Sequence, residues 1–347
     1  MRKSEFFGMP RAEAVALLAG APVVHLASTN ERGEPVLRAL HAVVLDEAVW
    51  FHGAPVGEKA EAIGRPAVIA AEEVVATIPS HVFDPERACP ATTYYRGAQA
   101  HGVLEAVEDV EVKARVLQAL MEKHQPEGGH VKITADDPLY RGAVRGIGVV
   151  RMGIAAIDGK SKLGQNRRPE ELTRVLEFLW RRGAPGDLRA LELVRGANPA
   201  LPVPGFLSGP PGARMLCALG ERDVAEACAL LAGSYWNVDV PEDRLARAHV
   251  GAQAWVGARD ADGALIGTAR ACSDGGKFAY LFDVMVAPRW RGRGLGQALV
   301  RLVLDHPAVR GARRVLLGTR DAMALYRKFG FAERGPRASV EMVLERQ

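Results

Sequence analysis

A glycine-rich basic turn lies between a predicted strand and a predicted helix, and it is the stretch most suited to chemistry. β-Favouring residues alternate over 280–286, Pro288 ends that strand, and an apolar-rich helix follows at 297–304. Glycine lets a backbone approach a ligand closely, and helix N-termini attract anions through their N–H groups. The stretch therefore predicts a phosphate or pyrophosphate site. The turn consists of Arg291, Gly292, Arg293, Gly294, Leu295 and Gly296.

The spacing of the turn narrows the choice of phosphate ligand. A Walker motif ends in Gly-Lys-Ser/Thr, which is absent here, and the dinucleotide fingerprint needs G-x-G-x-x-G. The glycines at 292, 294 and 296 give G-x-G-x-G instead. The pattern that fits is Arg-x-x-Gly-x-Gly over 291–296, which resembles the acetyl-CoA signature of the GNAT family of acetyltransferases. This resemblance implies that the turn holds the coenzyme pyrophosphate.

A second motif resembles the same family. A buried strand is predicted at 314–319, followed by a helix at 321–331 with a glycine cap at Gly330. The run Leu325-Tyr326-Arg327-Lys328-Phe329-Gly330-Phe331 resembles the family signature in which a tyrosine faces the coenzyme sulfur. Shorter pieces at 234–236, 283–286 and 318–322 resemble one bacterial branch of the family. That branch usually has histidine where this chain has Met323.

The resemblance implies acetyl transfer from acetyl-CoA to an amine. We expect backbone N–H groups of Val284, Met285 and Val286 to polarise the thioester carbonyl. Tyr326 is the candidate acid for the leaving thiolate, unless its ring only packs. Asp283 is the candidate base, and the alternative is a carboxylate that holds a loop by hydrogen bonds. The identity of the amine cannot be deduced from these motifs.

The N-terminal half has the pattern of a small β-barrel. Three strands with tight turns are predicted at 23–29, 36–44 and 48–52, and a short helix follows at 57–64. This arrangement resembles the FMN-binding split barrels related to pyridoxamine 5'-phosphate oxidase. The resemblance implies that Arg38 and Lys59 grip the FMN phosphate, whose negative charge favours paired cations. It also implies a homodimer through the barrel.

A motif at 160–167 adds to the barrel resemblance. Its sequence Lys-Ser-Lys-Leu-Gly-Gln-Asn-Arg resembles a Lys-x-Lys-Leu-Ser-Gln-Asn-Arg motif in a bacterial branch of split barrels, with Gly164 in place of serine. The domain prediction is a split barrel with flanking helices over 1–195, a Pro/Gly-rich linker over 196–213 and an α+β GNAT domain over 214–347. The second domain is expected to have a mixed, mostly antiparallel sheet.

Composition limits the other classes of function. The chain has 347 residues with a net charge of +4, 48% hydrophobic and 25% charged residues, which is ordinary for a globular protein. The small net charge gives no reason to expect nucleic-acid binding, and no segment predicts a membrane span. The four cysteines lack metal-ligand spacing, so we expect no metal site and a cytoplasmic location.

Two alternative functions stay open at this stage. The chain could be a regulatory protein that senses flavin and coenzyme, with the acetyltransferase half serving only as a sensor. It could also be a flavin-dependent oxidoreductase whose C-terminal half modifies a related substrate. Flavin absorbance of the purified protein and acetyl-CoA turnover on an amine panel would separate these classes.

Overall fold

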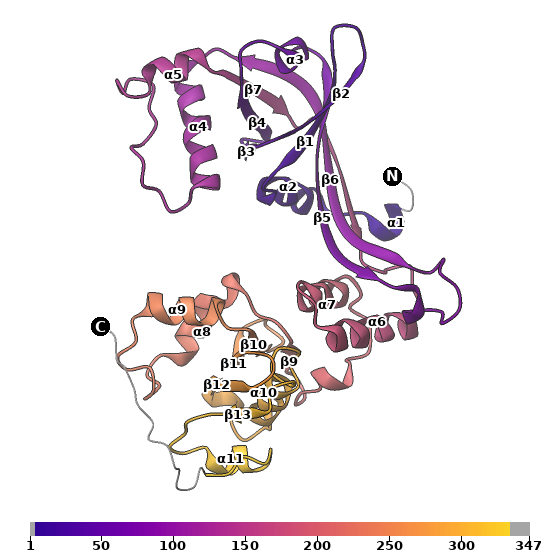
Figure 1. Ribbon diagram of the computed structural model, residues 1–347, viewed down its shortest axis with the longest axis vertical. Helices are drawn as coiled ribbons and strands as arrows, with labels where there is room; N and C mark the ends of the chain where they lie inside the picture. The colour runs from indigo at the N-terminus through magenta and orange to yellow at the C-terminus, as the bar shows by residue number, and fades with distance from the viewer. Residues whose placement is uncertain (1–3, 334–347) are drawn as a thin grey trace. The chain divides into compact units, whose positions relative to one another are not determined.

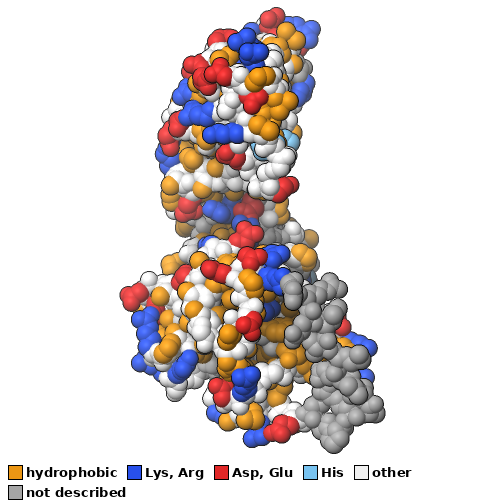
Figure 2. Space-filling model, turned by 90° about the vertical axis from the view of Figure 1, so that its left-hand side faces the viewer, with side chains coloured by type: hydrophobic (Ala, Val, Ile, Leu, Met, Phe, Trp, Pro, Cys, Tyr) orange, Lys and Arg blue, Asp and Glu red, His pale blue; other side chains and the backbone are white. Residues whose placement is uncertain are grey.

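The computed structural model describes residues 4–333, except for the side chains of residues 58 and 59. It forms two compact units, residues 1–171 and 172–347 (Figure 1). Acidic and basic side chains are interspersed over the face shown in Figure 2. No helix among the described residues is both long enough and apolar enough to cross a bilayer.

Unit 1 is a barrel-like β structure with helices on its outside. Its strands hydrogen-bond in the order β2-β1-β5-β6-β7-β4-β3, and β8 pairs with β6. The elements of this unit, in chain order, are α1 (Ser4–Phe7), α2 (Arg11–Gly20), β1 (Val24–Thr29), β2 (Pro35–Leu40), β3 (Val43–Leu45), β4 (Ala48–Gly53), α3 (Glu58–Glu61), β5 (Pro66–Ile78), η1 (Ser80–Val82), β6 (Thr92–Val107), α4 (Val110–His124), α5 (Arg141–Gly146), β7 (Gly148–Gly153) and β8 (Ala156–Lys162).

Two of the apolar clusters of unit 1 pack its sheet against helices. Leu26, Phe51 and Ile69 belong to the first cluster, where α2 covers the sheet. The helix approaches β8 closely because Gly159 has no side chain: a Cβ there would lie 2.9 Å from the Cβ of Ala14. The second cluster, which includes Trp50, lies under α4. The predicted split barrel with flanking helices is confirmed.

Unit 2 has a five-stranded sheet in the order β13-β12-β11-β10-β9. All pairs are antiparallel except β12 and β13, which are parallel, so the predicted mixed sheet is confirmed. The elements are α6 (Pro169–Arg182, which begins just before the unit boundary), α7 (Asp187–Ala197), η2 (Gly205–Leu207), β9 (Arg214–Leu216), η3 (Glu221–Asp223), α8 (Val224–Leu231), α9 (Glu242–Val250), β10 (Ala254–Arg259), β11 (Leu265–Ser273), β12 (Phe278–Val286), η4 (Pro288–Trp290), α10 (Leu295–Leu304), β13 (Arg314–Leu316) and α11 (Met323–Arg327).

The division between the units differs from the predicted boundary. We expected α6 and α7 in the N-terminal domain, but Trp180 donates to Asp305 at 2.8 Å and the Cys217 N–H donates to Glu192 at 2.9 Å. The predicted linker also packs in unit 2, because Phe206 stacks on Trp180 with ring centroids 4.6 Å apart. Proline and glycine content indicated a linker, yet the apolar residues within the segment anchor it.

Helix α10 is placed against the sheet by one small residue. A Cβ at Gly267 of β11 would lie 2.8 Å from a methyl group of Leu299, so only glycine permits this approach. Leu295 and Leu299 of α10 are fully buried there. This packing fixes the N-terminus of α10 beside the end of β12, which is where the predicted anion site begins.

Candidate functional site

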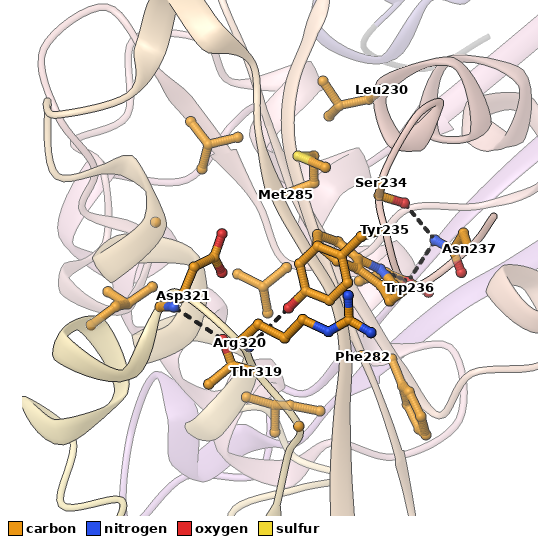
Figure 3. Close-up of a pocket in the computed structure, with 18 of the residues that line it drawn as sticks. Leu230, Ser234, Tyr235, Trp236, Asn237, Phe282, Met285, Thr319, Arg320 and Asp321 are labelled. Atoms are coloured by element: carbon orange, nitrogen blue, oxygen red, sulfur yellow. Dashed lines mark hydrogen bonds between the residues drawn. The ribbon is translucent and has the colours of Figure 1, made fainter.

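A cavity of about 1110 Å³ opens in unit 2 between the 230–237 segment, β12, the start of α10 and the 318–326 segment (Figure 3). Most of the residues predicted for catalysis and coenzyme binding in unit 2 line this cavity. Gly292 and Leu295 are not among the lining residues, and Arg293 and Gly294 line a smaller adjoining cavity of about 320 Å³. The predicted residues that line the large cavity are Asp283, Val284, Met285, Val286, Arg291, Gly296 and Tyr326.

A β-bulge shapes the wall formed by β12. In its pairing with β11, Asp283 and Val284 together lie opposite the single residue Ala269. Such a bulge leaves part of the ladder unpaired and turns the strand. Asp283 has φ of 51°, in the left-handed region that non-glycine residues rarely adopt. The bulge is therefore the place where backbone groups of β12 can face a ligand instead of the neighbouring strand.

The carboxylate of Asp283 is occupied by three donors. It accepts hydrogen bonds from Trp236 Nε1 at 2.8 Å, Asn237 Nδ2 at 3.1 Å and Arg270 Nε at 2.6 Å. Asp283 is only 6% exposed. These contacts tie the 234–237 segment to the bulge, which is the alternative role considered from the sequence. Its role as a base remains a prediction.

The glycine-rich turn has the geometry of an anion site. Gly292 and Gly294 have φ of 75° and 86°, and Gly294 is the N-cap of α10. Among the described residues, none accepts a hydrogen bond from the backbone N–H groups of residues 292–297. A row of unpaired donors at a helix N-terminus fits a pyrophosphate. The Leu295 side chain packs in the core, so that residue can contribute only its backbone to the ligand.

The arginines of the turn have different surroundings. Arg291 lines the large cavity, and its Nε donates to the Val286 carbonyl at 3.3 Å. The guanidinium carbon of Arg293 lies 5.2 Å from the centroid of the Trp290 ring. Both contacts leave most of the N–H groups of each guanidinium available for phosphate oxygens.

Tyr326 lies on α11 at the other wall of the cavity. Its ring is 8% exposed and packs edge-on against Phe331, with centroids 5.9 Å apart. Burial raises the pKa of the Tyr326 phenol, and the nearby Tyr235 and Asp321 raise it further. The phenol is therefore protonated at neutral pH and can donate a proton into the cavity.

No individual role was predicted from the sequence for Tyr235, Arg270 and Arg320, although all three line the cavity. The Tyr235 hydroxyl accepts a hydrogen bond from the Arg320 N–H at 2.9 Å, and its ring lies 4.6 Å from the guanidinium carbon. Tyr235 and Arg320 lie in pieces that resemble the bacterial branch. No spacing rule joins residues 85 positions apart, so their contact could not be foreseen.

The predicted flavin residues of unit 1 lie on two separate elements. Arg38 lies on β2, is exposed and donates to the Leu37 carbonyl at 2.8 Å. Lys59 lies on α3, and its side chain is outside the described part of the structure.

A cavity of about 390 Å³ instead lies on β5, β6 and β8, where Tyr95, Gln99 and Lys160 line it. In the strand pairing, Arg38 is opposite Leu26 and Leu26 is opposite Ile69, whereas Gln99 is opposite Ala70. Because neighbouring residues of a strand point to opposite faces, Arg38 lies on the other face of the sheet from this cavity.

The motif at 160–167 follows β8 into a turn. Gly164 has φ of 85°, so glycine suits the position better than the serine of the related motif. Lys160 lies over Tyr95, with its Nζ 5.4 Å from the ring centroid. The motif thus contributes a cation to the cavity of unit 1.

Unit 2 is thus an α+β domain with a glycine-rich turn at its cleft, and unit 1 is a split barrel. Comparison with known families agrees with this division. Residues 225–331 match the acetyltransferase (GNAT) family, and residues 10–161 match the pyridoxamine 5'-phosphate oxidase family. The chain therefore carries a pyridoxamine 5'-phosphate oxidase-like domain followed by a GNAT acetyltransferase domain.

Individual relatives match only part of the chain. A mycothiol acetyltransferase from Corynebacterium glutamicum is 46% identical over 55 residues, which are 15% of this chain and 19% of the relative. The glucosamine 6-phosphate N-acetyltransferase 1 of Oryza sativa subsp. japonica is 37% identical over 60 residues, 17% of this chain and 36% of the relative. The chain spans less than half the length of the curated relatives it matches, from 19% to 42%.

Solved structures match only part of the chain. The flavocytochrome Anf3 from Azotobacter vinelandii has 16% identity and a TM-score of 0.40, covering 46% of this chain and 71% of its own.

Proposed function

We propose that unit 2 transfers an acetyl group from acetyl-CoA to an amine. The observation that carries this proposal is the convergence of three features at the cleft and its adjoining cavity: the row of unpaired N–H groups at 292–297, the bulge of β12 and the Tyr326 phenol. The match of residues 225–331 to the GNAT family supports it. Acetyl-CoA supplies an activated acetyl thioester when it is bound.

Different residues of unit 2 contribute to coenzyme binding and to the chemical steps. The N–H groups at 292–297, together with Arg291 and Arg293, bind the pyrophosphate, and the backbone at 284–286 polarises the acetyl carbonyl. The amine nitrogen forms a bond to the acetyl carbon while the carbon–sulfur bond breaks. One proton leaves the nitrogen, and Tyr326 supplies one proton to the departing sulfur. The products are an acetamide and the coenzyme thiol.

We propose that Asp283 holds the 234–237 segment in place beside β12. Its three donors come from Trp236, Asn237 and Arg270, and they leave little of the carboxylate for a proton from the amine. The sequence-based proposal of Asp283 as the base, acting through water, predicts a loss of turnover with the fold intact in Asp283→Asn.

The function is tested with purified protein. We expect acetyl-CoA binding in calorimetry and release of free thiol when an amine panel is added. The panel should contain polyamines, aminoglycosides, amino acids and peptides with free N-termini. Coenzyme binding without thiol release on any amine would support a sensor, and no coenzyme binding would reject the proposal.

We also propose that unit 1 binds a flavin phosphate through Arg38 and Lys59. The match of residues 10–161 to the pyridoxamine 5'-phosphate oxidase family supports the proposal, and the Arg38 guanidinium is exposed on β2. A flavin supplies redox chemistry when bound, and the two cations would neutralise its phosphate. Exposed apolar side chains on the sheet, Leu37 at 62% and Val74 at 67%, support a homodimer through this unit.

Flavin binding is measured by quenching of FMN fluorescence. Arg38→Ala with Lys59→Ala should weaken binding at least about tenfold, because two charge-assisted contacts are lost. Arg32→Ala with Lys132→Ala removes two other exposed cations of unit 1 and should bind FMN normally. Equal FMN binding by both double variants would show that Arg38 and Lys59 do not bind the flavin phosphate. Sedimentation of the unmodified chain tests the dimer.

A further inference from the structure

The outer part of the unit 2 cleft carries two neighbouring side chains of opposite charge, Arg320 and Asp321. Both residues are exposed, and among the described residues none accepts a hydrogen bond from the Arg320 guanidinium or forms an ion pair with Asp321. The other charges of the cleft are engaged. Arg270 pairs with Asp283 at 2.6 Å, and Arg291 is part of the coenzyme turn. Among the described residues that line the cleft, the unpaired charges available to an acceptor are therefore one cation and one anion.

Arg320 is held in place by a chain of contacts that reaches the core. The Tyr235 hydroxyl accepts its backbone N–H, and the Tyr235 ring lies under its guanidinium. That ring packs edge-on against Trp236 with centroids 4.8 Å apart, and Trp236 is bonded to Asp283. Figure 3 shows the Arg320 side chain extending beside the Tyr235 ring. A guanidinium fixed in this way can bind a carboxylate without a large loss of side-chain entropy.

Asp321 lies toward the reacting end of the cleft. The negative charge of Asp321 helps to raise the pKa of the Tyr326 phenol. This phenol is the proposed proton donor to the coenzyme sulfur. In the view of Figure 3, Asp321 lies on the side of the Tyr235 hydroxyl away from the Arg320 guanidinium. An ammonium group beside Asp321 would thus be close to the acetyl group, while an anionic group of the same molecule would reach Arg320.

The wall near Arg320 is aromatic. Phe282 stacks on Tyr280 with ring centroids 4.5 Å apart, and Figure 3 shows Phe282 on the other side of the Arg320 side chain from Tyr235. Phe282 is half-buried and lines the cavity. An apolar group of the acceptor can pack there, because aromatic surfaces provide a large contact area.

We propose that the acetyl acceptor is an amino acid with an apolar side chain and a free carboxylate. The proposal rests on the acetyltransferase function of unit 2. The carboxylate binds Arg320, the side chain packs on Phe282, and the ammonium group lies beside Asp321. Asp321 takes one proton from the ammonium, and the neutral nitrogen then forms the bond to the acetyl carbon as the carbon–sulfur bond breaks. Tyr326 gives its phenol proton to the departing sulfur, and the second proton lost by the nitrogen restores that phenol. The product is neutral at nitrogen, so its contact with Asp321 is lost and its release is favoured.

The test uses pairs of acceptors that differ only in the carboxylate. Phenylalanine is compared with phenethylamine, tryptophan with tryptamine and leucine with isoamylamine. We expect the full-length chain to prefer the amino acid of at least one pair by about tenfold to a hundredfold in kcat/KM, the range of one charge-assisted contact. Arg320→Gln should raise the KM of that amino acid by the same factor. The decarboxylated amine and acetyl-CoA should keep their KM values.

Two further variants sharpen the test. Arg320→Lys keeps the charge but loses the planar fork, so it should recover part of the preference. Arg313→Gln removes an exposed arginine that does not line the cleft and should behave as the unmodified chain.

Three outcomes would overturn the proposal: equal kcat/KM within every pair, an equal loss on both members in Arg320→Gln, or acetyl-CoA binding without acetylation of any of these amino acids. Absence of acetyl-CoA binding in calorimetry is a different result, because it rejects the function of unit 2 itself.

Discussion

The two units contrast in how their predicted ligand residues are arranged. In unit 2, the predicted residues gather around one cleft and the adjoining cavity, because most of them belong to a continuous strand–turn–helix segment. In unit 1, Arg38 lies on the face of the sheet opposite the described cavity. A site built from consecutive backbone groups forms wherever its local structure forms. A site built from distant side chains depends on how the strands are paired.

The largest expected effect comes from the backbone of the coenzyme turn. Gly294→Val should abolish acetyl-CoA binding, because valine is strained at φ of 86° and its side chain obstructs the pyrophosphate. Calorimetry measures the loss. Gly263→Val is the matched control, since Gly263 has φ of 83° in a hairpin turn outside the cleft.

Gly263→Val should lose as much stability as Gly294→Val, but it should bind acetyl-CoA with the affinity of the unmodified chain. An unchanged dissociation constant in Gly294→Val would show that the turn is not the coenzyme site. Unit 2 would then no longer differ from unit 1 in having its predicted ligand residues gathered at one binding site.

The next effect concerns the chemical step. Tyr326→Phe should lower kcat by about 10²–10⁴, the range for a general acid, while the KM for acetyl-CoA changes little. The phenylalanine ring keeps its contact with Phe331. Because burial raises the Tyr326 pKa above the ordinary value of 10.0, the kcat of the unmodified chain should not fall from loss of this proton until pH exceeds 10.

Steady-state rates across pH with an active acceptor measure both effects. Full activity in Tyr326→Phe would assign the residue to packing alone. The thiolate would then leave unassisted or with water as its acid.

Asp283→Asn separates positioning from base catalysis. Asparagine tolerates the positive φ of this position, but it leaves the Arg270 guanidinium, whose side chain is only 11% exposed, without its anion. Breaking such a pair costs about 3–5 kcal/mol, so we expect a large loss in the free energy of unfolding of unit 2. Denaturant titration followed by tryptophan fluorescence measures it, with bound acetyl-CoA identifying the transition of unit 2. Full stability together with lost turnover would instead support the base.

A smaller effect is the pH dependence of unit 2 stability. Burial lowers the pKa of His306 from 6.5 to about 4. The unfolded chain therefore binds this proton more readily, and stability that is full above pH 6.5 should fall as pH drops toward 4. The shift corresponds to about 3 kcal/mol.

Melting curves between pH 4 and 7 test the His306 effect, with bound acetyl-CoA identifying the transition of unit 2. His306→Asn should flatten the pH dependence of this transition. An unchanged slope in that variant would assign the acid sensitivity to other groups.

The sequence by itself determined the parts that depend on short-range pattern. Alternation over 280–286, the glycines at 292 and 294 and the apolar residues after them predict a strand, a glycine-rich turn and a helix, because every group involved lies within one local segment. These elements were predicted with their types and order.

Only the tertiary structure decided which distant side chains meet. Asp283 receives its donors from residues 13 to 47 positions away, and Tyr235 meets Arg320 across 85 positions. The packing of α6 and α7 in unit 2 likewise could not be predicted from the sequence, because an apolar helix face indicates burial but not the partner. Contacts of this kind depend on the register and layering of a whole domain, which no local spacing encodes.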